Sequence, residues 1–153
     1  IAQHPIYGDV YCYETDGQGK QLLMDDANIP SLLALPFLGV LPKDDERYRR
    51  TRKLILSDVN PYYYEGKVAR GIGSPHTPKD YIWHIALNVQ CLTSSDKDEI
   101  EELLSMLANS DADTGWMHEG FHKDDPSQFT RPWFAWSNSM LAANLQALAE
   151  EDV

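Results

Sequence analysis

The chain has 153 residues, 42% of them hydrophobic and 24% charged, and a formal net charge of −11. This length and balance are typical of a globular domain with a core of its own. The acidic excess argues against a nucleic-acid partner, because phosphate binding needs clustered Lys and Arg. No stretch approaches the roughly 18 apolar residues of a membrane-spanning helix, so no membrane segment is evident. The chain begins at Ile1 rather than Met, so we expect it to come from a longer protein, and no compartment is indicated.

The N-terminal third is expected to form a β-hairpin followed by two helices. Residues 10–15 alternate in polarity, and the glycine-containing run 16–19 is typical of a turn. The Asp and Asn residues that precede Pro30 predict the start of a short helix, which runs to about Leu38 and is ended by Gly39. Residues 43–56 predict a second helix.

The remaining two thirds alternate predicted helices with long loops. Residues 62–78 and 110–131 are rich in Gly, Pro and aromatic side chains and are expected to be irregular loops. Apolar residues at helical spacing predict helices over 79–92 and 96–109. A last helix is expected to begin at Pro132. We therefore predict an all-α architecture of packed helical hairpins whose loops carry the site.

The segment from His118 to His122 matches the zinc motif H-E-x-x-H, in which two His on one helical face bind the metal and the Glu acts as base. That chemistry requires a helix. Gly115 and Gly120 bracket the segment and Pro126 follows it, so no helix is expected here. The match to the zinc motif is therefore weak, and a zinc-dependent hydrolase stays only as an alternative hypothesis.

Polar residues beside aromatic residues recur in four places, which suits a sugar, because sugar rings have apolar faces and hydroxyl-lined edges. Glycoside cleavage usually needs two carboxyl groups. Each cluster also has a plainer interpretation: Asp26 or Asn28 as a helix cap, His84 as an interior histidine, and Trp133 as a core residue. A non-catalytic carbohydrate-binding or scaffold protein therefore remains a second alternative.

Five long segments resemble glycoside hydrolase family 125, the metal-independent exo-α-1,6-mannosidases related to fungal meiotically upregulated proteins. The resemblance extends almost from end to end of the chain. The segments are MDDANIPSLLALPFLG (24–39), NPYYYEGKVARGIGSPHTP (60–78), YIWHIALNVQCLTS (81–94), TGWMHEGF (114–121) and FTRPWFAWSNS (129–139).

The resemblance implies a fold, a reaction and a set of site residues. The fold would be a partial (α/α)6 toroid, with residues 1–153 as the C-terminal portion of one catalytic domain. The reaction would be inverting hydrolysis of terminal α-1,6-linked mannose without a cofactor or metal. Glu119 would be the catalytic base, and the general acid would lie outside this chain. The residues expected to bind the substrate are Asp25, Asp26, Asn28, Arg70, Ser74, His76, Trp83, His84, His118 and Trp133.

The same resemblance implies two partners. One is an α-1,6-mannoside, from mannan or from an N-glycan-derived oligosaccharide. The other is the missing N-terminal half of the domain, because family members are far longer than this chain. Without that half, the chain alone is expected to be inactive.

Overall fold

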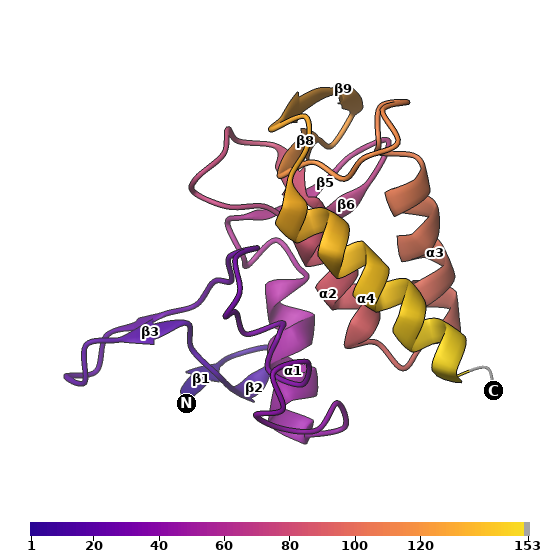
Figure 1. Ribbon diagram of the computed structural model, residues 1–153. Coiled ribbons are helices and arrows are strands. Elements are labelled where there is room, and N and C mark those ends of the chain that lie inside the picture. Colours follow the sequence, from indigo (N-terminus) through magenta and orange to yellow (C-terminus); the bar gives the residue numbers. More distant parts are fainter. Residues whose placement is uncertain (152–153) are drawn as a thin grey trace.

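The computed structural model describes residues 1–151, and within them helices and short antiparallel strands alternate (Figure 1). The helices are α1 (Glu46–Ile55), α2 (His84–Leu92), α3 (Lys97–Ala108) and α4 (Ala135–Glu151). The strands are β1 (Ala2–His4), β2 (Gly8–Val10), β3 (Glu14–Thr15), β4 (Gln21–Leu22), β5 (Tyr63–Glu65), β6 (Arg70–Ile72), β7 (Tyr81–Trp83), β8 (Gly120–His122) and β9 (Asp125–Thr130).

The strands form three two-stranded hairpins, β1–β2, β3–β4 and β5–β6, and one three-stranded sheet in the order β7–β8–β9. The prediction of an all-α fold, a partial (α/α)6 toroid, is therefore wrong, because the described chain is a mixture of helices and sheets. The N-terminal β-hairpin is confirmed: β3 and β4 pair around the glycine-containing turn at residues 16–19.

Helix α2 lies at the centre, between α3 and α4 (Figure 1). Every side chain from His84 to Cys91 is buried. Two apolar clusters meet on this helix. One includes Ile85 and Val89 with α1 and the N-terminal segments, and the other includes Leu87 with α3 and Phe121 of β8. The helix that carries His84 is therefore held on all sides.

Strand β7 occupies the start of the predicted helix 79–92. Trp83 pairs with Gly120 and Tyr81 with His122, so the backbone groups that would begin a longer helix are used in the sheet. The two predicted loops contain the hairpins β5–β6 and β8–β9 for the same reason. Pairing partners lie up to about forty residues apart in sequence, and helical periodicity does not reveal them.

The helix predicted between Pro30 and Leu38 is not formed, and this segment is a series of turns. Pro36 explains the difference, because it lacks an N–H and its ring would clash with the carbonyl of Leu32 in a helix. The carboxylate of Asp25 accepts the backbone N–H groups of Leu32 and Leu33 at 2.8 and 2.9 Å and so begins the series of turns.

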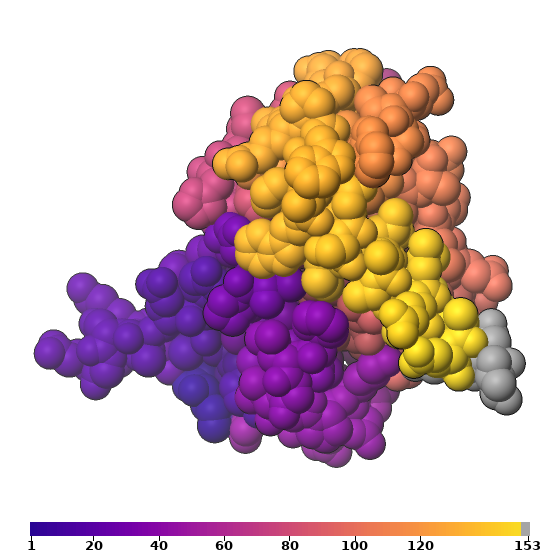
Figure 2. All heavy atoms as spheres, viewed as in Figure 1, coloured from indigo at the N-terminus to yellow at the C-terminus, as the bar shows by residue number. Residues whose placement is uncertain are grey.

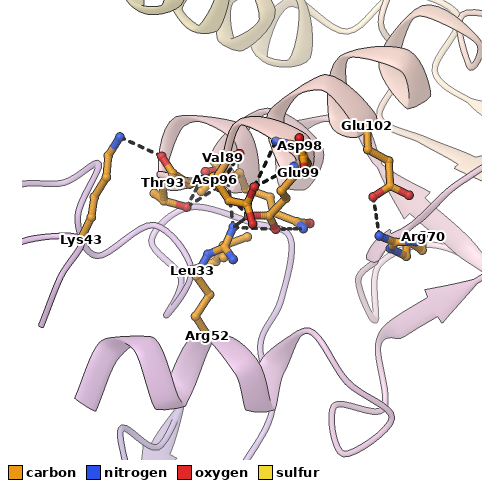
Figure 3. Close-up of polar contacts among 12 residues, drawn as sticks. Leu33, Lys43, Arg52, Arg70, Val89, Thr93, Asp96, Asp98, Glu99 and Glu102 are labelled. Carbon is orange, nitrogen blue, oxygen red and sulfur yellow. Dashed lines mark hydrogen bonds and ion pairs between the residues drawn. The ribbon is translucent and has the colours of Figure 1, made fainter. Parts of the chain in front are cut away.

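Helices α1 and α3 agree with the predicted helices 43–56 and 96–109, and each begins at an Asp cap. Asp45 accepts the N–H of Tyr48, and Asp96 accepts those of Asp98 and Glu99. Arg52 of α1 reaches across to Glu99 of α3, with Nη2 2.9 Å from both carboxylate oxygens (Figure 3). The ion pair joins these two helices beside a cavity of about 690 Å³.

The hairpin β3–β4 projects from the body of the molecule, and in Figure 2 α4 (yellow) forms part of the visible face above the N-terminal segments (purple). Several aromatic side chains remain exposed at and before the start of α4, among them Trp116, Trp133 and Trp136. Among the described helices, none combines the length and apolar character needed to cross a membrane.

Candidate functional site

Glu119 lies directly before β8, and its backbone N–H donates to the carbonyl of Thr130 in β9 at 3.3 Å. The Glu119 side chain is only 14% exposed, and its Oε1 lies 3.0 Å from Nε of Arg131. The Arg131 guanidinium also lies over the ring of Phe134, 5.3 Å from its centroid. The carboxylate is thus largely withdrawn from water and held from one side by a cation.

Trp83 is a buried side chain that lies close to the strand following Glu119. It pairs with Gly120 across the sheet, and a Cβ on Gly120 would approach the indole ring to 3.0 Å. The indole N–H donates to Oγ1 of Thr77 at 2.9 Å, and the ring meets Phe134 edge-on at 6.4 Å. Glycine at position 120 therefore lets the indole lie against the strand that follows Glu119.

The predicted sugar-binding segments 25–28 and 74–78 are joined to each other. The N–H of Ala27 donates to the carbonyl of Gly73 at 3.0 Å. The Asn28 amide donates to both oxygens of Asp26 and, at 3.4 Å, to Oγ of Ser74. Through the 74–77 turn and Thr77, these residues connect to Trp83 and so to the neighbourhood of Glu119.

His76 and Asp25 differ sharply in accessibility. His76 is exposed on the 74–78 turn, and its backbone N–H donates to Oγ of Ser74. Asp25 is fully buried, and its two oxygens accept backbone N–H groups of Leu32 and Leu33. Burial raises the pKa of Asp25 to about 7, although those two hydrogen bonds act in the opposite direction. The Asp25 side chain therefore supports the turn that follows it.

His84 and His118 are both fully buried, with ring centroids 5.7 Å apart. The ring of His118 stacks on Phe129 at 3.8 Å, and its Nδ1 and Nε2 lie 2.8 and 3.2 Å from the carbonyls of Pro132 and Asp111. The ring of His84 contacts the backbone of His118 and the hydroxyl of Ser110. Burial lowers the pKa of His84 to about 4.

Arg70 and Trp133 complete the predicted set. Arg70 forms an ion pair with Glu102 of α3 (Figure 3), and the structure does not join it to the contacts around Glu119. Trp133 is 58% exposed, two residues after Arg131, and presents an apolar ring to the surface. The contacts thus connect Asp26, Asn28, Ser74, Trp83 and Glu119, with His118 held in the adjacent interior.

The zinc motif is not helical here, because β8 begins at Gly120 within it. An extended segment of four residues spans about 13 Å, so His118 and His122 do not share a metal as they would on a helix. Both rings also have other partners: His118 faces carbonyl oxygens, and Nδ1 of His122 accepts the N–H of Asp124. Within residues 1–151, no group of three His, Cys, Asp or Glu side chains is placed to hold a metal ion.

The sequence patterns did not indicate Arg131 or Thr77 as site residues, although they contact Glu119 and Trp83, respectively. Arg131 contacts Glu119, and Thr77 accepts the hydrogen bond of Trp83. Both lie inside the segments that carry the family resemblance, which was the available signal. Their partners become visible only when β9 and the 74–78 turn are placed beside β7 and β8.

Comparison with known proteins identifies the chain. Residues 1–145 match glycoside hydrolase family 125, the metal-independent alpha-mannosidases. Meiotically up-regulated gene 157 protein of Schizosaccharomyces pombe is 52% identical over 151 residues, which are 98% of this chain and 30% of that protein. A solved Streptococcus pneumoniae structure, from a family of metal-independent alpha mannosidases and in a non-productive complex with alpha-1,6-mannobiose, is 50% identical. Its TM-score is 0.89, with 92% of this chain and 33% of that chain covered.

The chain spans about a third of the length of these relatives. The family match includes the segments that contain Asp26, Ser74, Trp83 and Glu119. The chain therefore belongs to glycoside hydrolase family 125, the family of metal-independent alpha-mannosidases.

Proposed function

We propose that this chain supplies the catalytic base and part of the sugar pocket of an inverting exo-α-1,6-mannosidase. The observation that carries the proposal is the Glu119 carboxylate, 14% exposed and 3.0 Å from Arg131 Nε, beside a strand that packs against Trp83. The relative solved with alpha-1,6-mannobiose, at 50% identity, supports the substrate class. Terminal α-1,6-linked mannose on mannan or on N-glycan-derived oligosaccharides is the proposed substrate.

In an inverting hydrolysis, one carboxylate removes a proton from water while a carboxylic acid on the other side of the sugar protonates the leaving oxygen. The two carboxyl groups lie about 6.5 to 9.5 Å apart, which leaves room for the water. Glu119 is assigned the first role. The Arg131 guanidinium orients one oxygen of the carboxylate, and the other oxygen is left to accept the proton of the water.

The general acid is assigned to no residue of this chain. Asp25 is fully buried and both its oxygens bind backbone N–H groups, so a leaving oxygen has no access to it. Asp26 is buried and its oxygens bind Asn28. The relatives are about three times as long, which leaves the acid to the remainder of the protein. We therefore expect the chain alone to be inactive.

The decisive substitution is Glu119→Gln in the complete protein that contains this chain. It keeps the size of the side chain and removes the proton acceptor. We expect the turnover number for α-1,6-mannobiose to fall by roughly 10²- to 10⁴-fold, the usual contribution of an acid or base. The matched control is Glu101→Gln on the exposed face of α3, which should retain full turnover. Equal turnover of Glu119→Gln and the unmutated protein would contradict the assignment.

A chelator separates the metal-dependent alternative from this mechanism. Turnover in the presence of EDTA should equal turnover without it, because Glu119 acts here on water without a metal. Loss of turnover with EDTA, restored by zinc, would instead support a hydrolase that uses His118 and His122. Absence of any turnover by the unmutated complete protein would favour a carbohydrate-binding or scaffold role.

A further inference from the structure

We infer that His84 and Ser137, which are fully buried, are positioning residues that grip the His118 backbone and thereby fix the Glu119 carboxylate. The inference rests on the proposed role of Glu119 as base. His84 lies at the start of α2 and Ser137 near the start of α4. Neither side chain is exposed, so each acts through the peptide that leads to Glu119.

The ring of His84 contacts the backbone of His118 through one nitrogen and Ser110 through the other. Nδ1 lies 3.0 Å from both the N and the carbonyl oxygen of His118, so it accepts the N–H in one tautomer and donates to the carbonyl in the other. Nε2 lies 3.0 Å from Oγ of Ser110, and the Ser110 hydroxyl also contacts the carbonyl of Leu107. In either tautomer the ring holds the His118 backbone and is itself anchored to the end of α3.

The environment of His84 keeps the ring neutral. It contacts the rings of Phe121 and His118 in the interior. Burial lowers its pKa to about 4, while the backbone of His118 and Ser110 and the charge of Asp111 act in the opposite direction. At the pH of an ordinary assay the ring is thus neutral, and its Nδ1 contacts the His118 backbone as an acceptor or as a donor.

Ser137 grips the other side of the same residue. Its hydroxyl donates to the carbonyl of His118 at 2.8 Å, and this carbonyl belongs to the peptide bond that joins His118 to Glu119. Asn138 binds both the N–H and the carbonyl of Met117, at 3.1 and 2.9 Å. On the far side, Thr130 accepts the N–H of Glu119.

The backbone from Met117 to Glu119 is therefore fixed by side chains of two helices and by strand β9. Sequence neighbours do not supply these contacts, so the carboxylate has the rigidity of the α2–α4 packing rather than that of a loop. A base displaced by about 1 Å can cost about 10²-fold in rate even when the substrate still binds. Removing either grip should accordingly lower kcat and leave KM unchanged.

A matched pair of variants isolates the grip of His84 in the complete protein. His84→Asn places an amide near the position of Nδ1, where it can accept from the His118 N–H or donate to the His118 carbonyl. His84→Gln places its amide near Nε2 and loses that contact. With α-1,6-mannobiose as substrate, we expect kcat of the Gln variant to fall about 10²-fold, with KM within twofold of the unmutated value. The Asn variant should keep kcat within about tenfold.

Ser137→Ala provides a second and smaller test, which does not depend on the fold tolerating a change at His84. It should also lower kcat at constant KM, by about tenfold, because one of the two grips remains. Thr51→Val is the control. It removes the hydrogen bond that the buried Thr51 hydroxyl accepts from Tyr11, far from Glu119 in the chain, and should alter stability without changing kcat.

Unchanged kcat in both His84→Gln and Ser137→Ala would overturn the inference while leaving the role of Glu119 intact. A rise in KM at constant kcat would overturn it as well, because the residues would then serve substrate binding. Glu119→Gln is measured alongside. If that variant keeps full turnover, the proposed function fails and the positioning role fails with it.

Discussion

At the scale of single residues, the ion pair between Glu119 and Arg131 orients the Glu119 carboxylate but adds little to the stability of the fold. Arg131 is 64% exposed, and an exposed ion pair adds about 0 to 1 kcal/mol to the free energy of unfolding. Its backbone lies in the left-handed region, with φ 50°. Strain of this kind concentrates at functional sites. The residue with this strained backbone, Arg131, is the one whose guanidinium contacts Glu119, the proposed base.

The pKa of His84 gives a testable pH dependence of stability. In the unfolded chain its pKa is 6.5, and in the folded chain about 4. As pH falls from 7 to 5, His84 becomes protonated in the unfolded state but stays neutral in the folded state. The free energy of unfolding therefore decreases, and His84 contributes about 2 kcal/mol to this decrease. Below the folded pKa the decrease stops.

Denaturant unfolding at pH 7 and pH 5 measures this effect, with His84→Asn as the comparison. The neighbouring His118 and Asp111 remain in both proteins, so the difference between the two pH profiles reports His84. The variant should lose about 2 kcal/mol less than the unmutated protein between these pH values. Identical profiles for the two proteins would show that His84 is not held neutral.

At the scale of elements, local sequence signals predicted helices but not the sheet around them. Helices α1 and α3 have Asp caps and amphipathic spacing, and both were predicted close to their observed bounds. The strands β7 and β8 depend on pairing between residues about forty positions apart, which a local pattern does not contain. The sequence itself contains Pro36, which prevents the helix predicted between Pro30 and Leu38.

Gly73 shows how closely these elements approach one another. A Cβ at this position would lie 2.1 Å from the carbonyl oxygen of Tyr81 and 2.8 Å from the ring of Tyr64. Gly73→Ala must therefore separate β7 from the β5–β6 hairpin, and we expect a loss of about 3 kcal/mol in the free energy of unfolding.

Gly17→Ala is the matched control, because open space surrounds Gly17 in its exposed turn. Its positive φ of 71° limits the expected loss to about 1 kcal/mol. Thermal unfolding of both variants gives the comparison. Equal melting temperatures for the two would contradict the close approach of Gly73 to β7.

At the scale of the whole molecule, the family resemblance implied the wrong fold class, and the site residues that it implied stay a prediction. It singled out Glu119, Trp83 and Ser74, which the structure connects through Gly120 and Thr77. It gave no account of His84 and Ser137 as backbone ligands, because a buried polar side chain has the same sequence signal whether it binds a sugar or a peptide group.

The chain corresponds to about a third of its relatives. Trp116, Trp133 and Trp136, which are near Glu119 in the sequence, have exposed side chains. A proposed base alone is not a complete glycosidase site, because the reaction also needs an acid across the sugar. We therefore propose that this chain supplies one carboxylate of a two-carboxylate mechanism.

Azide rescue of Glu119→Ala in the complete protein tests the proposed role of Glu119 as catalytic base most directly. Azide needs no base, so it can replace the water that Glu119 would activate. We expect very low turnover of an activated α-mannoside by Glu119→Ala, recovery when azide is added, and β-mannosyl azide as the product in the proton NMR spectrum. Full turnover without azide, or an α-mannosyl azide product, would contradict the role of Glu119 as the base of an inverting mannosidase.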